Sequence, residues 1–195
     1  MPEADTEAQR RSGRLKAFFI LLVCAAPTIA AYLAYYVWQP QGRTNYGELV
    51  EPRQVTATAL TAADGRASSL ADLKGKWVMV QFDDAACAEA CARKLFAMRQ
   101  SRLAQGREMD RIERVWVVLD TGTTNPEVAK LTDDVHVLRA KDPGVMAHFP
   151  APESVRDHVY LIDPLGNVML RFPREADPRR MMKDLSRLLK ASRVG

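Results

Sequence analysis

The chain has 195 residues, of which 47% are hydrophobic and 27% are charged, and its formal net charge is +4. This composition is ordinary for a globular domain and excludes a disordered or fibrous chain. Lys and Arg are spread along several predicted helices without a Gly-aromatic motif, so we expect no nucleic-acid partner.

The N-terminal region has the pattern of a membrane anchor. Residues 1–16 are polar, with four basic residues near their end, and are predicted to form a cytoplasmic tail. Residues 17–38 form about 22 residues without a charge, which at 1.5 Å per residue span roughly 33 Å of bilayer. The positive-inside rule then places the rest of the chain in the periplasm, on a single-pass inner-membrane anchor. A cleaved signal peptide is the alternative, disfavoured because the apolar run is long and no small-x-small site follows it.

A tether and a globular domain are predicted to follow the anchor. Residues 39–53 contain Pro and Gly and are predicted to be the tether, so the domain spans 54–195. Alternation of apolar and polar residues predicts a first strand over 54–60, with a turn at 64–65. The leucine spacing at 70–73 predicts a single helical turn.

The middle of the domain alternates strands with helices. The apolar runs 77–82 and 115–119 are predicted to be buried strands. A helix over 88–105 separates them and ends at Gly106, with Leu95, Phe96 and Leu103 predicted on its apolar face. Shorter elements are then predicted: a helix at 126–131, a strand at 135–138 and a helix at 143–149.

The chain ends in a predicted hairpin and a helix. Strands at 159–162 and 168–172 flank Asp163-Pro164-Leu165-Gly166, which suits a type I turn. Asp177 is the expected N-cap of the last helix and Pro178 its first residue. This order predicts an α/β fold, a thioredoxin-like domain behind one N-terminal transmembrane helix.

Two cysteines occupy the turn from the first central strand into its helix. Cys24 lies in the apolar anchor and is interpreted as a packing residue, which leaves Cys87 and Cys91 as candidates for metal or redox chemistry. On the first turn of a helix their Cβ atoms would lie roughly 5–6 Å apart, which suits two thiolates on one metal ion. A disulfide needs about 3.8 Å and would require that turn to distort. A structural disulfide in an oxidising compartment remains the alternative.

The charges around the cysteine pair favour a bound cation. A helix N-terminus favours thiolate, whereas nearby carboxylates oppose it unless a cation is present. The acidic residues concerned are Asp83, Asp84 and Glu89.

Several motifs together resemble the Sco/SenC family. They are the anchor, Lys74-Gly75-Lys76-Trp77 at the start of a strand, the CxxxC motif, and Asp157-His158 ahead of Tyr160-Leu-Ile-Asp-Pro-Leu-Gly166. Members are membrane-anchored, thioredoxin-like proteins that help assemble the copper site of cytochrome c oxidase. The resemblance covers about residues 50–192. It implies that Cys87, Cys91 and His158 bind copper, as Cu(I) or Cu(II), and that the partner is the copper-bearing subunit of the oxidase.

The chain departs from the family pattern around these ligands. The family has Pro after each Cys and an aromatic-Thr pair before the first, whereas here Ala88 and Ala92 follow the cysteines and residues 83–86 are Asp-Asp-Ala-Ala. The family's His also lies further ahead of the following strand than His158 does. The chain is therefore interpreted as a divergent member. Of the other histidines, His136 is expected to be structural or exposed.

Three functions are compatible with these features. The first is a copper(I)-binding assembly factor whose ligands are Cys87, Cys91 and His158. The second is a thiol–disulfide oxidoreductase in which Cys87 and Cys91 are catalytic and keep the oxidase's copper-ligand cysteines reduced; the CxxxC spacing, wider than CxxC, argues against a general reductase. The third is a non-catalytic assembly scaffold with a decayed site. Whether the protein is an enzyme is thus open at this point.

Overall fold

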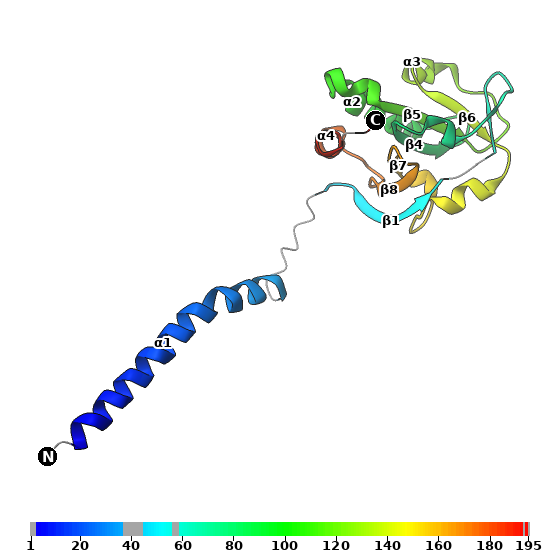
Figure 1. Ribbon diagram of the computed structural model, residues 1–195. Coiled ribbons are helices and arrows are strands. Elements are labelled where there is room, and N and C mark those ends of the chain that lie inside the picture. Colours follow the sequence, from blue (N-terminus) through cyan, green and yellow to red (C-terminus); the bar gives the residue numbers. More distant parts are fainter. Residues whose placement is uncertain (1–2, 37–44, 56–58, 193, 195) are drawn as a thin grey trace. The chain divides into compact units, whose positions relative to one another are not determined.

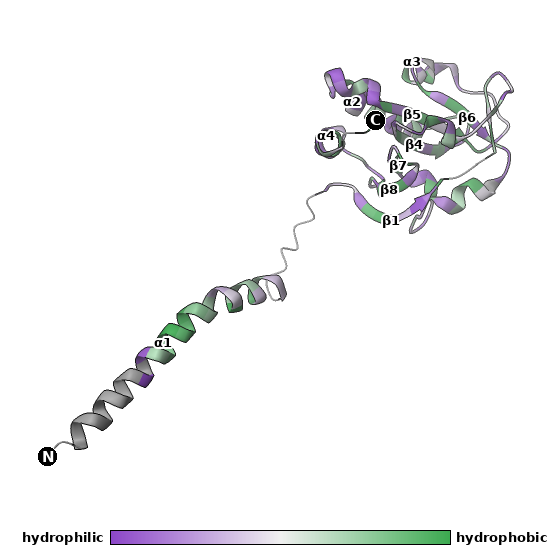
Figure 2. Ribbon diagram, viewed as in Figure 1, coloured by the Kyte–Doolittle hydropathy of each residue, from purple (hydrophilic) through white to green (hydrophobic). Residues whose placement is uncertain are grey.

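The computed structural model describes residues 3–36, 45–55, 59–192 and 194, and it divides the chain into two units, Met1–Arg43 and Thr44–Gly195 (Figure 1). In the first unit, helix α1 (Glu3–Tyr36) contains the segment Lys16–Tyr36, which is long and apolar enough to cross a membrane. Figure 2 shows the middle of this helix in green, with paler, mixed colours towards its C-terminal end. The last two residues of the predicted span, 37 and 38, lie outside the described residues.

An eight-stranded mixed sheet forms the frame of the second unit. The strand order is β1-β8-β7-β4-β5-β6-β2-β3, with β4, β5 and β6 parallel to one another and the other pairs antiparallel. The strands are β1 (Glu48–Gln54), β2 (Leu60–Ala62), β3 (Ala67–Ser68), β4 (Trp77–Asp83), β5 (Ile112–Val118), β6 (His136–Ala140), β7 (Val159–Ile162) and β8 (Asn167–Arg171). The predicted α/β class is confirmed. The predicted strand over 54–60 falls partly on residues 56–58, outside the described residues.

Helices α2 (Glu89–Leu103) and α4 (Pro178–Ala191) pack against each other on one face of the sheet (Figure 1). Helix α4 begins as predicted: the Asp177 carboxylate accepts a hydrogen bond from the Arg179 amide at 2.8 Å, and Pro178 is its first residue. The shorter helical elements are α3 (Ala129–Thr132) and the 3₁₀ turns η1 (Leu70–Leu73), η2 (Gly106–Arg111), η3 (Pro126–Val128), η4 (Pro143–His148) and η5 (Val155–Asp157).

The buried face of α2 differs from the predicted one. Leu95 is buried as expected, but Phe96 and Leu103 are about half exposed. Lys94 and Ser101 are buried instead, because each finds hydrogen-bond acceptors: Ser101 donates to the Pro178 carbonyl at 3.2 Å. The buried face of this helix therefore combines apolar residues such as Ala97 and Met98 with two polar residues that have partners on other elements.

The two faces of β4 enter different hydrophobic clusters. Val78, Val80 and Phe82 pack on one side with Phe149 and with residues of β5 and β7. Side chains alternate along a strand, so Trp77, Met79 and Gln81 point to the other side, where α2 and α4 lie. A third cluster, which contains the cysteine pair, joins α2 to β5.

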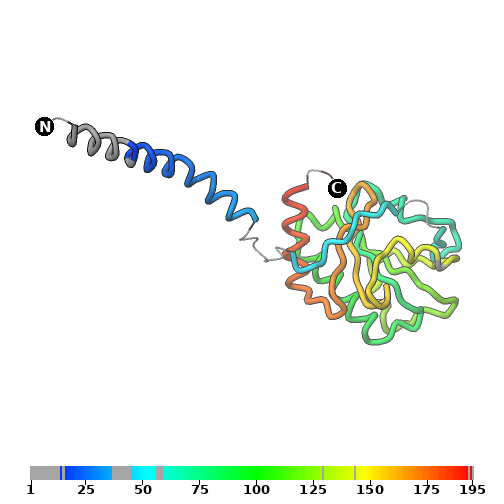
Figure 3. Tube along the Cα trace, turned by 90° about the horizontal axis from the view of Figure 1, so that it is seen from below, coloured from blue at the N-terminus to red at the C-terminus, as the bar shows by residue number. Residues whose placement is uncertain are grey.

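The prediction of a tether over 39–53 is wrong for its second part, which forms strand β1. Residues 48–53 pair with β8 at the edge of the sheet, as Figure 3 shows for the cyan and orange segments, whereas 39–44 lie outside the described residues. The strand is held where it begins. The Gly47 amide donates to the Asp184 carboxylate at 2.8 Å, and a Cβ at Gly47 would come within 2.4 Å of Leu170. Pro52 is tolerated because the strand lies at an edge.

The predicted hairpin is confirmed. Strands β7 and β8 are antiparallel, and the Gly166 amide donates to the Asp163 carbonyl at 2.9 Å to close the turn. Gly166 has φ of 92°, a backbone conformation that favours glycine. The Asp163 carboxylate fixes the turn by accepting the amides of Leu165 and Asn167.

Candidate functional site

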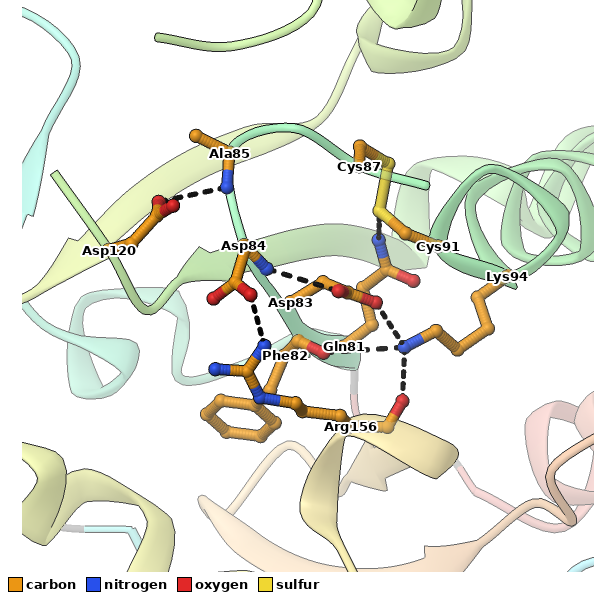
Figure 4. Close-up of a disulfide and its surroundings, with 10 residues drawn as sticks. All are labelled: Gln81, Phe82, Asp83, Asp84, Ala85, Cys87, Cys91, Lys94, Asp120 and Arg156. Atoms are coloured by element: carbon orange, nitrogen blue, oxygen red, sulfur yellow. Dashed lines mark hydrogen bonds and ion pairs between the residues drawn. A yellow bond between two sulfur atoms is a disulfide. The ribbon is translucent and has the colours of Figure 1, made fainter. Parts of the chain in front are cut away.

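Cys87 lies in the loop between β4 and α2 and Cys91 in the first turn of α2, and the two form a disulfide with Cα atoms 5.1 Å apart (Figure 4). Helix α2 begins at Glu89, so Cys87 precedes the helix and does not share its first turn with Cys91. Cys87 has φ of 42°, an uncommon conformation for a residue with a side chain. This turn of the backbone brings the sulfurs together, which the prediction of a common helical face did not anticipate.

The disulfide is nearly closed to solvent. Cys87 is 4% exposed and Cys91 1%, and they pack in the third hydrophobic cluster with Leu95 and Trp116. A protein or metal can therefore reach the sulfurs only if the loop that contains Cys87 rearranges. Cys24, by contrast, is a free cysteine of α1, within the segment that could cross a membrane.

The loop between β4 and Cys87 is fixed by backbone hydrogen bonds. The Ala85 amide donates to the Asp120 carboxylate at 2.9 Å, and the Ala85 carbonyl accepts the Asn125 amide at 3.2 Å (Figure 4). The Cys87 amide donates to the Asp84 carbonyl at 3.0 Å. These bonds attach the loop to the segment that follows β5.

A buried amide contacts the disulfide from beneath. Gln81 of β4 is fully buried, and its Nε2 donates to the Cys91 Sγ at 3.5 Å (Figure 4). Its Oε1 is also buried and has no hydrogen-bond partner among the described residues. Sequence reasoning missed Gln81, although an amide inside an otherwise apolar strand is a signal that could have found it.

A buried cation lies one helical turn beyond Cys91. Lys94 Nζ is 3.0 Å from the Asp83 carboxylate, 3.3 Å from the Phe82 carbonyl, and also donates to the Arg156 carbonyl. Burial lowers the pKa of Lys94, and the negative charge of Asp83 opposes that shift. Lys94 thereby connects the start of α2 to η5, and sequence reasoning did not identify it.

A second ion pair joins the same two regions. Arg156 lies 2.5 Å from the Asp84 carboxylate, and this hydrogen bond raises the pKa of the guanidinium (Figure 4). Asp83 and Asp84, predicted to favour a cation beside the cysteines, thus each face a basic side chain of the protein itself. The negative charge near the pair is therefore largely offset.

The third predicted ligand, His158, contacts groups other than the sulfurs. His158 precedes β7, and its Nδ1 is 2.8 Å from the Phe172 carbonyl. Its ring lies beside Tyr160, with centroids 6.0 Å apart, on the side of the sheet where Tyr160 packs against Phe82. Gln81, which contacts Cys91, points to the opposite side. Neither of these contacts of His158 involves Cys87 or Cys91.

The described residues contain no group of three or more His, Cys, Asp and Glu side chains that could hold a metal. His136 is exposed and lies 3.2 Å from Glu113, in line with the expectation for it. What remains at the predicted site is a pair of sulfurs. Oxidised, they form a disulfide; reduced, they offer two soft donors at a four-residue spacing.

Most of the second unit matches a known protein family. Residues 77–192 match the family described as "transmembrane-like, thioredoxin-like, C-terminal domain". The match extends from the start of β4 through α4 and so contains the cysteine pair, Gln81 and Lys94. No curated protein sequence matches the chain.

Solved structures of Sco proteins have the same fold. Apo Sco1 from Thermus thermophilus superposes with a TM-score of 0.60 at 19% identity, covering 74% of this chain and 97% of that one. Copper-bound yeast Sco1 gives 0.57 at 14% identity, covering 77% and 96%. BsSco, whose structure identified a disulfide switch in a member of the Sco family of cytochrome c oxidase assembly proteins, gives 0.54 at 16% identity, covering 74% and 96%.

These comparisons confirm the thioredoxin-like fold and, at the level of the fold, the Sco/SenC resemblance seen in the sequence. The low identities agree with a divergent chain. The chain belongs to the family of proteins with a transmembrane-like, thioredoxin-like C-terminal domain, and that domain has the fold of the Sco proteins.

Proposed function

We propose that the protein is a single-pass, membrane-anchored factor for assembly of the copper site of cytochrome c oxidase, with its domain on the periplasmic side of the inner membrane. In its reduced form, Cys87 and Cys91 bind copper(I) and pass it to the copper-bearing subunit of the oxidase by ligand exchange. The observation that carries the proposal is the cysteine pair at the β4–α2 turn, its sulfurs within bonding distance, in a domain with the Sco fold.

The donor set suits copper(I) as cargo. Two thiolates satisfy a soft ion that accepts low coordination, whereas a structural zinc site needs four ligands. His158 is the third ligand predicted from the sequence. To reach the sulfurs, it would have to leave the Phe172 carbonyl and the side of the sheet occupied by Tyr160. We therefore propose that the two sulfurs alone hold the ion.

Copper binding requires that the disulfide first be opened. The S–S bond accepts two electrons and two protons from a dithiol reductant, which leaves as a disulfide. Both products on this protein are thiols, and loss of their protons on metal binding gives the two thiolate ligands. Oxidation of the pair would thus switch off copper binding.

A copper(I) competition titration tests this proposal. The full chain in detergent is reduced, freed of reductant, and titrated with copper(I) against a chromophoric chelator. Cys87→Ser and Cys91→Ser should each lower the affinity by at least about 100-fold. Cys24→Ser, the matched control outside the pair, should leave it unchanged.

His158→Ala sharpens the same titration. We expect a change within about threefold; a loss beyond roughly tenfold would make His158 a third ligand and refute the two-sulfur site. A wild-type protein that loses copper(I) to a modest chelator would refute the copper proposal as a whole.

The disulfide itself favours a second candidate, a thiol–disulfide reductase that keeps the oxidase's copper-ligand cysteines reduced. It needs the cysteine pair and no third group. Reduced wild-type protein should then reduce a peptide that carries the partner's disulfide, without copper, and each Cys→Ser variant should fail to do so.

A further inference from the structure

Gln81 occupies an unfavourable place for an amide. It lies in the central strand β4, opposite Trp116 of β5 and Val159 of β7, and is fully buried. Burial of an amide costs free energy unless its donors and acceptor are hydrogen-bonded. In the disulfide form its Nε2 donates to a disulfide sulfur, and its Oε1 has no partner in the described part of the chain.

Reduction of the pair improves one of these two contacts, and the protonation state of Cys91 decides which. A disulfide sulfur is a weak acceptor, whereas a thiolate accepts a charge-assisted hydrogen bond that is about twice as strong. If Cys91 is a thiol instead, its S–H can donate to the Gln81 Oε1 after rotation of the amide. The amide therefore has a better partner in the reduced state whichever form Cys91 takes.

We propose that Gln81 stabilises the reduced form of the Cys87–Cys91 pair relative to the disulfide, and so sets how readily the pair is reduced. This inference rests on the proposed function in one respect, that the pair cycles between disulfide and dithiol. Two glutathione thiols supply the two electrons and two protons that open the S–S bond, and they leave as glutathione disulfide. Gln81 itself exchanges neither electrons nor protons with the pair; it supplies a hydrogen-bonding group.

Met79 distinguishes this role from simple packing. It lies two residues earlier on the same strand and the same face, and it is also fully buried. Met79→Leu disturbs the packing under α2 without touching a hydrogen bond to sulfur. A change in the redox equilibrium at Gln81 but not at Met79 therefore reports the amide.

The test is a glutathione redox titration. The full chain in detergent is equilibrated at a series of glutathione ratios, and its free thiols are alkylated and counted. Gln81→Met, which keeps the length of the side chain, should lower the equilibrium constant for reduction roughly tenfold, a potential about 30 mV more negative. Met79→Leu should stay within about twofold of wild type.

A second variant keeps the test valid if Gln81→Met does not fold. Gln81→Asn keeps the amide but withdraws it from Cys91 by one methylene, so its equilibrium should shift in the same direction. The inference is overturned if a folded Gln81 variant matches wild type, shifts towards easier reduction, or shifts no more than Met79→Leu.

Copper(I) titration of the chemically reduced proteins separates this inference from the proposed function. If wild type holds copper(I) and the Gln81 variants show no redox shift, the inference fails and the copper proposal stands. If the redox shift appears but reduced wild type holds no copper(I), the copper proposal fails and the role of Gln81 stands. A wild-type disulfide that no glutathione ratio opens would overturn both.

Discussion

The two sides of β4 differ in kind. On one, Phe82 packs edge-on against Phe149 and lies near Tyr160, with few polar groups among the rings. On the other, Gln81 contacts the disulfide, and Lys94 of α2 pairs with Asp83 at the end of the strand. Both sides contain buried hydrophobic clusters, but only the second also holds a buried amide in contact with the disulfide.

This difference accounts for the position of His158. A histidine that a family pattern pairs with the cysteines can still lie on the other side of the sheet from Gln81. His158 joins the aromatic side through Tyr160 and caps the end of β8 through the Phe172 carbonyl. Its contacts are those of a structural residue, whereas those of Gln81 and Lys94 connect to the sulfurs and their loop.

The largest expected effect is on the aromatic side. Phe82→Ala removes a fully buried ring and should lower the free energy of unfolding by about 3–5 kcal/mol. Urea denaturation of the 44–195 unit, which contains the three hydrophobic clusters, measures it. Copper(I) affinity of the folded variant should stay within about threefold of wild type, and a larger fall would mean that the two sides are not separate.

Lys94→Met should have an intermediate effect. It leaves the Asp83 carboxylate and two carbonyls without their cation, at a cost of about 2 kcal/mol after allowance for the partial exposure of Asp83. Urea denaturation at pH 7 measures the loss. Arg93→Met, at the exposed neighbouring position, is the control and should change stability by less than about 0.5 kcal/mol.

The same variant tests the titration of Lys94. Its pKa is lowered in the folded protein, so above that lowered value the unfolded chain binds the proton more tightly. Between the lowered pKa and the usual value of 10.5, wild-type stability should therefore rise with pH relative to Lys94→Met. A difference between the two proteins that stays constant up to pH 10 would contradict this assignment.

The smallest expected effect is at Tyr160. Its hydroxyl donates to the Pro150 carbonyl at 3.2 Å, so Tyr160→Phe should cost about 1 kcal/mol at pH 7. Burial raises the pKa of Tyr160 from 10.0 to about 12. The folded state thus holds this proton more tightly, and the stability it confers is present below pH 10 and is lost as the pH rises towards 12.

Alkaline unfolding monitored with the tyrosine absorbance checks this. Tyr160→Phe should remove part of the fall in stability between about pH 10 and 12. The exposed His136→Ala is a suitable control on the same sheet, with no change expected in that range. An equal alkaline fall in wild type and Tyr160→Phe would place the titration elsewhere.

Local patterns were sufficient for several elements. The apolar spacing and the Asp177-Pro178 start predicted α4, the Asp163–Gly166 turn predicted the β7–β8 hairpin, and the cysteines were correctly placed at the β4–α2 turn. Each of these depends on residues close together in the sequence. The α/β class followed from their order.

Contacts between distant segments could not be predicted in this way. Lys94 is buried where a carbonyl 62 residues away, that of Arg156, accepts a hydrogen bond from its ammonium group. The periodicity of the helix alone could not reveal that partner. The disulfide forms with a positive φ at Cys87. A positive φ is usually predicted from a glycine, and this position has none. Strand β1 escaped notice because nearly all its residues are exposed, so it has no apolar alternation to reveal it.

Strand β1 also has a practical consequence for handling the soluble part of the protein. A fragment that begins at Gln54, the boundary suggested by the sequence, lacks nearly all of this strand and leaves the outer N–H and C=O groups of β8 uncovered. An open edge of this kind is a template for pairing between molecules and hence for aggregation. A fragment that begins at Asn45 keeps Tyr46 and Gly47, which attach the strand to the Glu175 carbonyl and the Asp184 carboxylate, and so carries its own protection against self-association.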